Sequence, residues 1–370
     1  MASSFSQIFD SLWVERLVEQ CTQTTATQAQ SILQKTQWTL ADLPVLLSPA
    51  MSPLLEELAQ HAHRITQQRF GKAMQLFVPM YLANVCYNSC SYCGFSMEND
   101  YKRIVLSPDE ILKEGLHLKQ KGFQHLLLLT GEADKSSIQF IAEAIGLLRP
   151  HFASIGIEIQ PLDTPDYHRM TQSGADSLTV YQETYHPEAY ARYHTRGKKR
   201  NYTYRLDTPD RGGNAGFYRI NIGTLMGLYE WRYEALALAQ HLHYLSQTYW
   251  QNKYAVSFPR IQDMVGEFTP EHPISDRDFV QLICAFRLVF PDCGITLSTR
   301  EAPALRDALI PLGITTMSAE SNTAPGGYLG KEGTEQQFET ADHRSLNEIM
   351  ALLQLKGYEP VLKDWDPIHA

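Results

Sequence analysis

Three of the six cysteines lie within eight residues, and their spacing suits an iron–sulfur cluster. Cys86, Cys90 and Cys93 form a C-x3-C-x2-C pattern inside the segment NVCYNSCSYCGF. A [4Fe–4S] cluster is ordinarily held by four cysteines, so three thiolates would leave one iron without a protein ligand. An iron with an open coordination position can bind a small molecule and take part in chemistry. We therefore predict a reactive cubane cluster at this loop.

A zinc ion is the main alternative for the same cysteines. Structural zinc sites are closed by four protein ligands, but the next histidine after the loop is His117, 24 residues beyond Cys93, and the sequence has no second close pair of cysteines. The histidine pairs His61/His63 and His241/His243 have a spacing that turns their side chains apart on a helix, so we assign them no metal. A cluster is favoured, and a non-catalytic zinc-binding scaffold stays the alternative from a different class of protein.

The elements that must position this loop alternate along the chain. Short apolar runs are typical of buried parallel strands, and helical patterns lie between many of them. The helix after the cysteine loop is well marked, because Ser107 can cap it, Pro108 takes its first position, Glu110 completes a capping box and Gly122 ends it. This order predicts a TIM-type (β/α)8 barrel, with a doubly wound open sheet as the alternative. The eight expected strands are residues 75–82, 125–130, 155–160, 176–182, 218–223, 253–259, 293–299 and 314–319.

Two extensions are expected to flank the barrel. Residues 1–72 carry apolar side chains at helical spacing, interrupted by Pro44, Pro49 and Pro53, and predict a helical N-terminal extension. The barrel is expected over residues 73–325. Residues 326–370 are expected to form a short C-terminal extension with one helix and a terminal VLKDWD segment.

Charge and hydropathy exclude several classes of protein. The 370 residues include 32 basic and 41 acidic ones, which gives a net charge of −9. Because nucleic-acid binding depends on neutralising phosphates, we expect no nucleic-acid partner. No run approaches the roughly 18 apolar residues of a membrane span, and the N-terminus lacks the basic and apolar regions of a secretory signal. We therefore expect a cytoplasmic protein with no membrane partner.

The cysteine loop, with aromatic Tyr92 directly before its last cysteine, resembles the signature of radical S-adenosylmethionine (SAM) enzymes. That loop alone is shared by many radical enzymes. Taken in order with further motifs, it resembles the 2-iminoacetate synthases (tyrosine lyases) of bacterial thiamine biosynthesis over essentially the whole chain. The motifs are NSCSYCGFSM, LLLLTGE, VYQETYH, AVSFPR, LSTRE and PGGY.

This resemblance implies a fold, two cofactors and a reaction. In the family, a barrel holds a [4Fe–4S] cluster whose open iron binds SAM, and the reduced cluster cleaves SAM to methionine and a 5′-deoxyadenosyl radical. The cluster ligands here would be Cys86, Cys90 and Cys93. The reaction would be cleavage of the Cα–Cβ bond of L-tyrosine to 2-iminoacetate (dehydroglycine) and p-cresol. The implied partners are thiazole synthase and a low-potential electron donor, flavodoxin or ferredoxin.

The matching motifs also imply which residues contact SAM. They fall at the expected carboxyl ends of strands, where a barrel enzyme has its active site. Glu132 is expected at the SAM ammonium, Glu183 near the ribose hydroxyls and Arg205 at the SAM carboxylate. The other basic residues between Arg192 and Arg205, among them Lys199, are expected to form a solvated face. The full set expected to contact SAM is Tyr92, Gly131, Glu132, Gln160, Glu183 and Arg205.

Three further residues are implied in binding the amino acid and form the expected catalytic set. Arg300, at the end of the seventh expected strand, can bind a carboxylate bidentately, as the matching arginine does in related aromatic amino acid lyases. Tyr81 and Ser318 match positions that line the amino-acid site. Tryptophan lyase would use the same arginine and stays an alternative. The hydrogenase maturase that also splits tyrosine is disfavoured, because it carries additional C-terminal cysteines and none follows Cys293 here.

Overall fold

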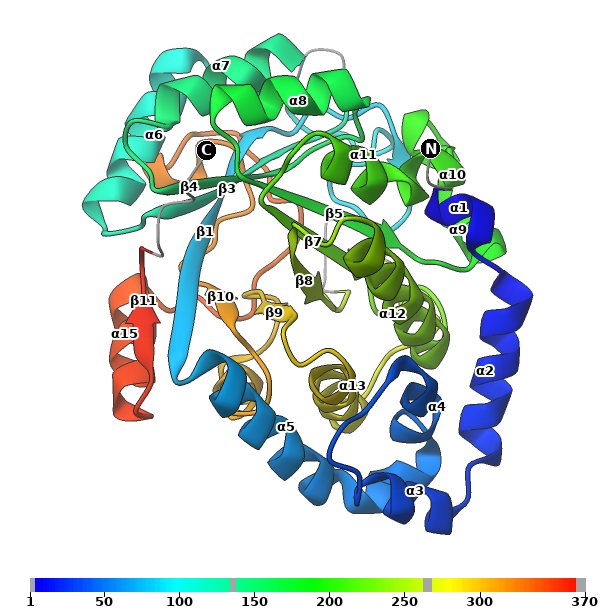
Figure 1. The fold of residues 1–370 in the computed structure, drawn as a ribbon. Coiled ribbons are helices and arrows are strands. Elements are labelled where there is room, and N and C mark those ends of the chain that lie inside the picture. Colours follow the sequence, from blue (N-terminus) through cyan, green and yellow to red (C-terminus); the bar gives the residue numbers. More distant parts are fainter. Residues whose placement is uncertain (1–3, 134–137, 262–267, 364–370) are drawn as a thin grey trace.

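Eight parallel strands stand at the centre of the molecule and close into a barrel (Figure 1). The structure is a computed structural model that describes residues 4–133, 138–261 and 268–363. The last strand of the barrel pairs with its first, which confirms the predicted (β/α)8 fold and excludes an open sheet. In order around the barrel, the strands are β1 (Ala73–Ala83), β3 (His125–Thr130), β4 (Ser154–Glu158), β5 (Ser177–Glu183), β7 (Arg219–Thr224), β8 (Lys253–Ser257), β9 (Gly294–Leu297) and β10 (Thr316–Ser318).

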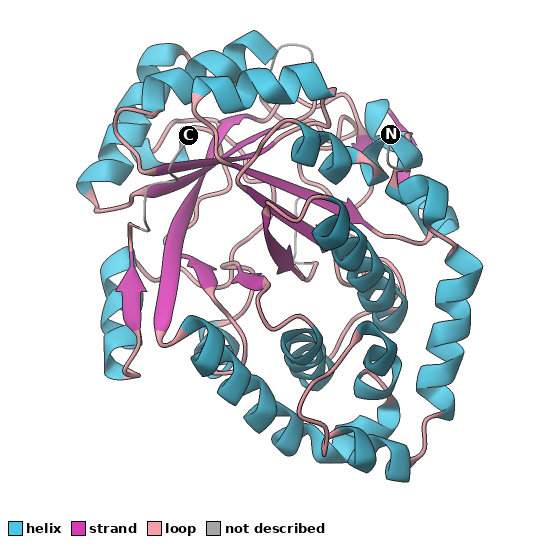
Figure 2. Ribbon diagram, in the orientation of Figure 1, coloured by secondary structure: helices cyan, strands magenta, loops and turns pink. Residues whose placement is uncertain are grey.

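Helices follow the strands and surround the barrel (Figure 2). This arrangement covers the strands on the outside, which explains why runs such as Leu126–Leu129 are almost wholly apolar. The main helices after successive strands are α6 (Pro108–Gln120), α7 (Ile138–Leu148), α8 (Thr164–Ser173), α11 (Thr208–Asn214), α12 (Trp231–Thr248), α13 (Asp276–Val289), α14 (Pro303–Leu309) and α15 (Leu346–Leu355).

Local signals in the sequence set where helix α6 begins and ends. The backbone N–H of Ser107 donates to Glu110 Oε2 (2.8 Å), and the N–H of Glu110 donates to Ser107 Oγ (3.4 Å), so the predicted capping box is present. Gly122 has a φ of 108°, a conformation that favours glycine and stops the helix. The chain therefore enters β3 at a fixed residue, and the carboxyl end of β3 lies at the rim of the barrel.

The N-terminal residues form a chain of short and long helices outside the barrel. Helix α2 packs against α12, and α5 packs against α13. Proline residues interrupt this region as expected, since Pro44 is the second residue of α4 and Pro49 is the first residue of η2. The elements are α1 (Phe5–Ile8), α2 (Ser11–Gln23), α3 (Ala26–Ile32), η1 (Leu40–Asp42), α4 (Leu43–Leu46), η2 (Pro49–Leu54) and α5 (Leu55–Phe70).

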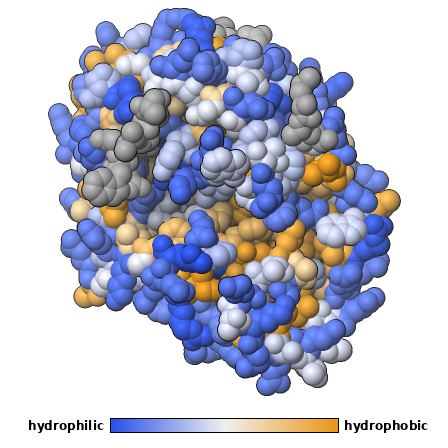
Figure 3. Space-filling model, in the orientation of Figure 1, coloured by the Kyte–Doolittle hydropathy of each residue, from blue (hydrophilic) through white to orange (hydrophobic). Residues whose placement is uncertain are grey.

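The C-terminal segment returns to the start of the barrel. After the short helix η4 (Gly327–Leu329) and α15, strand β11 (Glu359–Val361) pairs in parallel with residues 73–75 of β1. The last three residues of the expected VLKDWD segment lie outside the described residues, and the three-part domain division stays a prediction. On the face shown in Figure 3, hydrophilic side chains dominate the periphery and apolar side chains gather toward the middle. None of the described helices combines the length and apolar character needed to cross a membrane.

Candidate active site

The cysteine loop leaves β1 at the rim of the barrel and is pinned there on two sides. The side chain of Asn84 accepts a hydrogen bond from the backbone N–H of Ile104 (2.6 Å). Within the loop, β2 (Ser89–Cys90) pairs antiparallel with β6 (His194–Arg196), which lies after β5. Cys90 is buried, whereas Cys86 and Cys93 are half-buried. The fold thus holds the three predicted cluster ligands beside the carboxyl ends of the barrel strands.

The surroundings of the sulfur atoms fit a cluster. The side-chain amide of Asn88 donates to Cys86 Sγ (3.7 Å), and that of Gln337 donates to Cys93 Sγ (3.5 Å). Burial raises the pKa of Cys86 and of Cys90, so a coordinating metal would be needed to hold them as thiolates. N–H donors directed at the cysteine sulfurs are typical of the residues around an iron–sulfur cluster.

A single metal ion is the alternative occupant of the site formed by the three cysteines. In the part of the chain that the structure describes, no three His, Cys, Asp or Glu side chains are placed to hold one metal ion together. In a cubane, each cysteine binds a different iron, so its three sulfurs need not converge on one point.

Gly131 lets the end of β3 approach the cysteine loop closely. Its backbone N–H donates to the carbonyl of Ala83 (3.0 Å), and an added Cβ would lie 2.2 Å from the carbonyl oxygen of Val85. The next carbonyl, that of Glu132, accepts from the N–H of Tyr87 (3.0 Å). In the structure, Gly131 therefore contacts the loop that carries the cysteines, and a larger residue would displace that loop. Its expected contact with SAM stays a prediction.

Four charged side chains form a compact network beside the loop. Arg205 Nη1 donates to Glu132 Oε1 (3.0 Å), and Arg205 Nη2 donates to Glu183 Oε1 (3.2 Å). Glu132 Oε2 also accepts from the amide of Asn88 (2.7 Å), and Lys199 Nζ donates to Glu183 Oε1 (2.7 Å). Burial opposes ionisation of Glu183, but the charges of Lys199 and Arg205 outweigh it and lower its pKa. The structure thus brings together three residues predicted to contact SAM and pairs them with one another.

The prediction that Lys199 lies on a solvated face is wrong. Its side chain is largely buried against Glu183, with Nζ 5.7 Å from the centre of the Tyr92 ring. The cause is local: η3 (Lys198–Arg200) directly follows β6, and the backbone N–H of Lys199 donates to Asn88 Oδ1 (3.0 Å). This bond turns Lys199 inward while its neighbours Lys198 and Arg200 stay exposed.

Tyr92 is fixed by the segment that pairs with the loop. Its hydroxyl is 2.6 Å from His194 Nε2, and His194 Nδ1 is 2.7 Å from the carbonyl of Tyr190. Burial lowers the pKa of His194 to about 3, so the imidazole is neutral. The ring of Tyr92 therefore keeps one orientation at the edge of the cavity described next.

Two cavities meet at Lys199. The outer one lies at the ends of β3 and β4 and is bordered by Glu132, Gln160 and Arg205. Gln160 lies two residues beyond the end of β4. The inner one lies in the mouth of the barrel, and its lining includes Tyr81, Tyr92, Cys93, Leu127, Leu129, Glu158, Tyr181, Lys199, Ser257, Phe258, Arg300, Ser318, Gln337 and Phe338. The three residues predicted to bind the amino acid all lie in the inner cavity.

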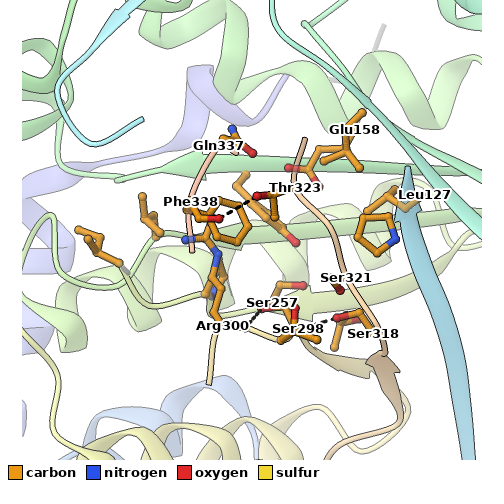
Figure 4. A pocket seen from close by; sticks show the side chains of 18 of the residues that line it. Leu127, Glu158, Ser257, Ser298, Arg300, Ser318, Ser321, Thr323, Gln337 and Phe338 are labelled. Carbon is orange, nitrogen blue, oxygen red and sulfur yellow. Dashed lines mark hydrogen bonds between the residues drawn. The ribbon is translucent and has the colours of Figure 1, made fainter. Parts of the chain in front are cut away.

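Arg300 reaches into the inner cavity from beyond β9 (Figure 4). Its guanidinium carbon lies 3.4 Å from the centre of the Phe338 ring. Arg300 Nη1 donates a long hydrogen bond to the carbonyl of Arg260 (3.5 Å). No carboxylate of the described residues forms an ion pair with Arg300. Ser318 ends β10, where its Oγ accepts from the N–H of Thr299 (3.1 Å), and Tyr81 donates to Gln337 Oε1 (2.8 Å). A charged guanidinium is thus available to an anionic ligand.

Glu158 and Gln337 are among the residues of this cavity that sequence reasoning missed. Glu158 could have been found from alternation along its strand, because Ser154, Gly156 and Glu158 share the inner side of β4. Gln337 gave no such signal, since it lies 244 residues after Cys93 in a loop of the C-terminal segment.

Comparisons with known proteins agree with this geometry. The family model of the Radical SAM superfamily matches residues 80–241, and that of the Biotin and Thiamin Synthesis associated domain matches residues 257–359. The 2-iminoacetate synthase of Escherichia coli (strain K12) is 45% identical over 344 residues, which are 92% of this chain and 91% of that protein. The 2-iminoacetate synthase of Salmonella typhimurium (strain LT2) is 42% identical with the same coverage.

Two crystal structures extend the comparison to the fold. HydG, a maturase of the [FeFe]-hydrogenase, superposes with a TM-score of 0.90 at 30% identity, covering 94% of this chain and 79% of that chain. Methylornithine synthase (PylB) superposes with a TM-score of 0.73 at 20% identity, covering 90% of this chain and 97% of that chain, and is similar in fold.

Proposed function

Because this chain belongs to the 2-iminoacetate synthase family of radical SAM enzymes, we propose that L-tyrosine is cleaved in the inner cavity of its barrel. The enzyme is a lyase that converts L-tyrosine to 2-iminoacetate and p-cresol, with SAM converted to 5′-deoxyadenosine and methionine. The iminoacetate supplies the thiazole part of thiamine. One observation carries the placement: the inner cavity has Cys93 at one side and, at another, Arg300, which pairs with no carboxylate of the described residues.

The cofactors are a [4Fe–4S] cluster and SAM. Cys86, Cys90 and Cys93 would ligate three irons, and the loop bonds from Asn84 and β6 would hold the sulfur atoms in place. When bound, the cluster and SAM together supply the abstraction of a hydrogen atom from the substrate.

We propose that SAM extends from the cluster into the outer cavity, which Glu132, Gln160 and Arg205 border. Gly131 would permit the close approach of that cavity to the cysteine loop, and Tyr92 would form its wall toward the inner cavity. The network of Glu132, Glu183, Arg205 and Lys199 offers both signs of charge to a zwitterionic cofactor. In this reading, Glu183 faces the ribose.

The substrate would be oriented by the inner cavity. Arg300 would hold the carboxylate, since a guanidinium presents two parallel donors to it. Tyr81 and Ser318 would line the site, and apolar walls such as Leu127 and Phe258 would surround the aromatic ring. The surrounding barrel would also keep bulk water from the product, which hydrolyses readily.

Two partners and a location follow from the family's reaction. Thiazole synthase would receive the iminoacetate, and flavodoxin or ferredoxin would deliver the electron. We place the enzyme in the cytoplasm, where disulfides are rare, and the structure has all six cysteines as free thiols.

The deciding experiment is anaerobic incubation of cluster-loaded enzyme with SAM, reductant and either tyrosine or tryptophan. p-Cresol and glyoxylate, the hydrolysis product of iminoacetate, are expected from tyrosine alone. An indole-derived product from tryptophan would instead indicate a tryptophan lyase. SAM cleavage with tyrosine but without p-cresol would rule out the proposed reaction.

A further inference from the structure

Glu158 is a carboxylate of the inner cavity to which the proposed reaction assigns no role. It ends β4 and lines the cavity, and its side chain is only half-buried because it faces that space. No residue that the structure describes forms a hydrogen bond or an ion pair with the side chain of Glu158. Glu132 and Glu183, by contrast, are each held by Arg205 at 3.0 and 3.2 Å. Holding a carboxylate away from bulk water without a partner costs free energy. A bound ligand with a cationic group would supply that partner.

The charges around Glu158 explain why it is poised to take a cation. Burial and the nearby charge of Glu183 raise the pKa of Glu158 to about 7, while Arg300, Arg205 and Lys199 act in the opposite direction. Two of those cations are already engaged by other carboxylates. A cationic group entering the cavity would therefore find Glu158 as its least compensated partner.

Arg300 stands on the opposite wall of the barrel. Strand β4 is separated from β9 by β5, β7 and β8 in one direction and by β3, β1 and β10 in the other. Figure 4 shows both side chains in the same cavity, with Arg300 rising beside Phe338 and Glu158 approaching from the far side. The cavity thus presents one guanidinium and one carboxylate to the same ligand, and neither has an ion-pair partner among the described residues.

That pair of charges matches a free amino acid. We propose that Glu158 binds the ammonium group of the substrate while Arg300 binds its carboxylate, so that the cavity recognises the zwitterion from two sides. This inference rests on the proposed function and adds a specificity residue to it. The ring then occupies the apolar part of the wall, which includes Leu127, Leu129 and Phe258.

The test compares ligands that lack one group at a time. Cluster-loaded enzyme with SAM is equilibrated anaerobically with L-tyrosine, with 3-(4-hydroxyphenyl)propanoate, which lacks the amino group, or with L-phenylalanine, which lacks the hydroxyl. Affinities are measured by equilibrium dialysis for wild type, Glu158→Gln and Glu158→Asp. Glu143→Gln, on the exposed face of α7, is the matched control for loss of a carboxylate.

Glu158→Gln is expected to weaken tyrosine and phenylalanine about ten- to hundred-fold, because a hydrogen-bonded charge pair is lost. The same variant should bind the amino-less acid as well as wild type does or better, and Glu158→Asp should recover part of the tyrosine affinity. An equal loss for tyrosine and the amino-less acid would overturn the inference, as would a loss for tyrosine that phenylalanine does not share, which would place Glu158 at the phenol.

Failure of the proposed function is seen separately, in wild type. Release of p-cresol by the wild-type enzyme supports that function, whatever affinities the Glu158 variants show. Should wild type prefer another amino acid, tyrosine is refuted, and the Glu158 comparison is made with that amino acid and its amino-less analogue. Iron content and SAM binding of Glu158→Gln equal to those of wild type show that the variant is folded.

Discussion

The charged side chains at the mouth of the barrel fall into two groups. Four of them pair with one another, whereas Arg300 and Glu158 have no ion-pair partner among the described residues. Glu132, Glu183, Arg205 and Lys199 neutralise one another within 3.2 Å. Arg300 instead stacks on Phe338. Burial lowers the pKa of Arg300, which reflects the cost of holding its charge away from water. An incoming carboxylate repays that cost, and so Arg300 is suited to bind substrate and not to brace the fold.

Arg300→Met should therefore raise the KM for tyrosine about 100-fold, because two charge-assisted hydrogen bonds of roughly 1.5 kcal/mol each are lost. Arg300→Lys should recover only part of this, since an ammonium lacks the two-pronged geometry. Both variants should keep wild-type iron content. p-Cresol formation at varied tyrosine concentration gives the measurement, and an unchanged KM in Arg300→Met would remove Arg300 from the substrate site.

Gln337 links the inner cavity to the cysteine loop. Its amide nitrogen donates to Cys93 Sγ, and its amide oxygen accepts from Tyr81. A donor to a cluster sulfur stabilises the reduced, more negative state. Gln337→Leu should lower the midpoint potential of the cluster by about 20–40 mV, since a net hydrogen bond is worth roughly 0.5–1 kcal/mol.

A potentiometric titration followed by electron paramagnetic resonance checks this shift. Gln336→Leu is the matched control, because Gln336 is exposed. The hydrogen bond has no influence on the cluster if both variants have the wild-type potential.

At this scale, the sequence predicts residues whose chemistry is tied to spacing. The three cysteines and Arg300 belong to short motifs, and the structure places them at the barrel mouth. Lys199 could not be predicted, because a run of basic residues resembles a solvated face until one backbone bond to Asn88 turns a single side chain inward.

Among the elements, the junction of β1 and β3 sets the position of the cysteine loop. An added Cβ at Gly131 would lie 2.2 Å from the Val85 oxygen and 3.1 Å from Cys86 Cβ, and the first contact is with backbone that cannot move aside alone. Gly131→Ala should therefore shift the loop, lower the iron content after reconstitution and destabilise the protein by about 1–3 kcal/mol.

Gly146→Ala is the control for this prediction. Gly146 lies on the exposed side of α7, where an added Cβ meets nothing within 4 Å. Alanine there should leave iron content unchanged and stabilise the helix by about 1 kcal/mol. Equal iron content and equal urea midpoints for the two variants would show that the close approach at Gly131 is unimportant.

The elements themselves were predictable, because apolar runs bounded by turn residues carry a local signal. All eight expected strands are present, and the capping box at Ser107 marks the start of α6 as expected. Their ends were less predictable. Strands β9 and β10 are shorter than the apolar runs 293–299 and 314–319, since apolar character continues into buried residues outside the strands, such as Cys293 and Ala319.

For the whole molecule, the C-terminal segment completes the site from a distance. It brings Gln337 to Cys93 of the cysteine loop and Phe338 to Arg300. Cys93 precedes Gln337 by 244 residues. No periodicity in the sequence encodes such a contact, because its geometry depends on where the barrel closes. A buried ionic cluster fixes the segment: Asp342 pairs with Arg306 and Arg344, and its backbone N–H donates to the carbonyl of Thr299 (3.1 Å).

Asp342→Asn should release this anchor. The side chains of Asp342 and Arg306 are both fully buried, so removing one charge leaves the other uncompensated and should cost about 3–5 kcal/mol in the free energy of unfolding. Asp307→Asn, which removes a half-exposed partner of Arg344, should cost less than about 1 kcal/mol.

Acid should narrow the difference in stability between wild type and Asp342→Asn. Burial opposes ionisation of Asp342, but Arg344 and Arg306 outweigh it and lower the pKa from 3.8 to about 2. A carboxyl with a lowered pKa in the folded state binds its proton more readily when unfolded, so its stabilisation is full above about pH 4 and declines as the pH falls toward 2. Urea unfolding of both proteins between pH 7 and 2.5 should show the gap narrowing below pH 4. A gap that stays constant over this range would mean that the charge of Asp342 does not hold the C-terminal segment over the barrel.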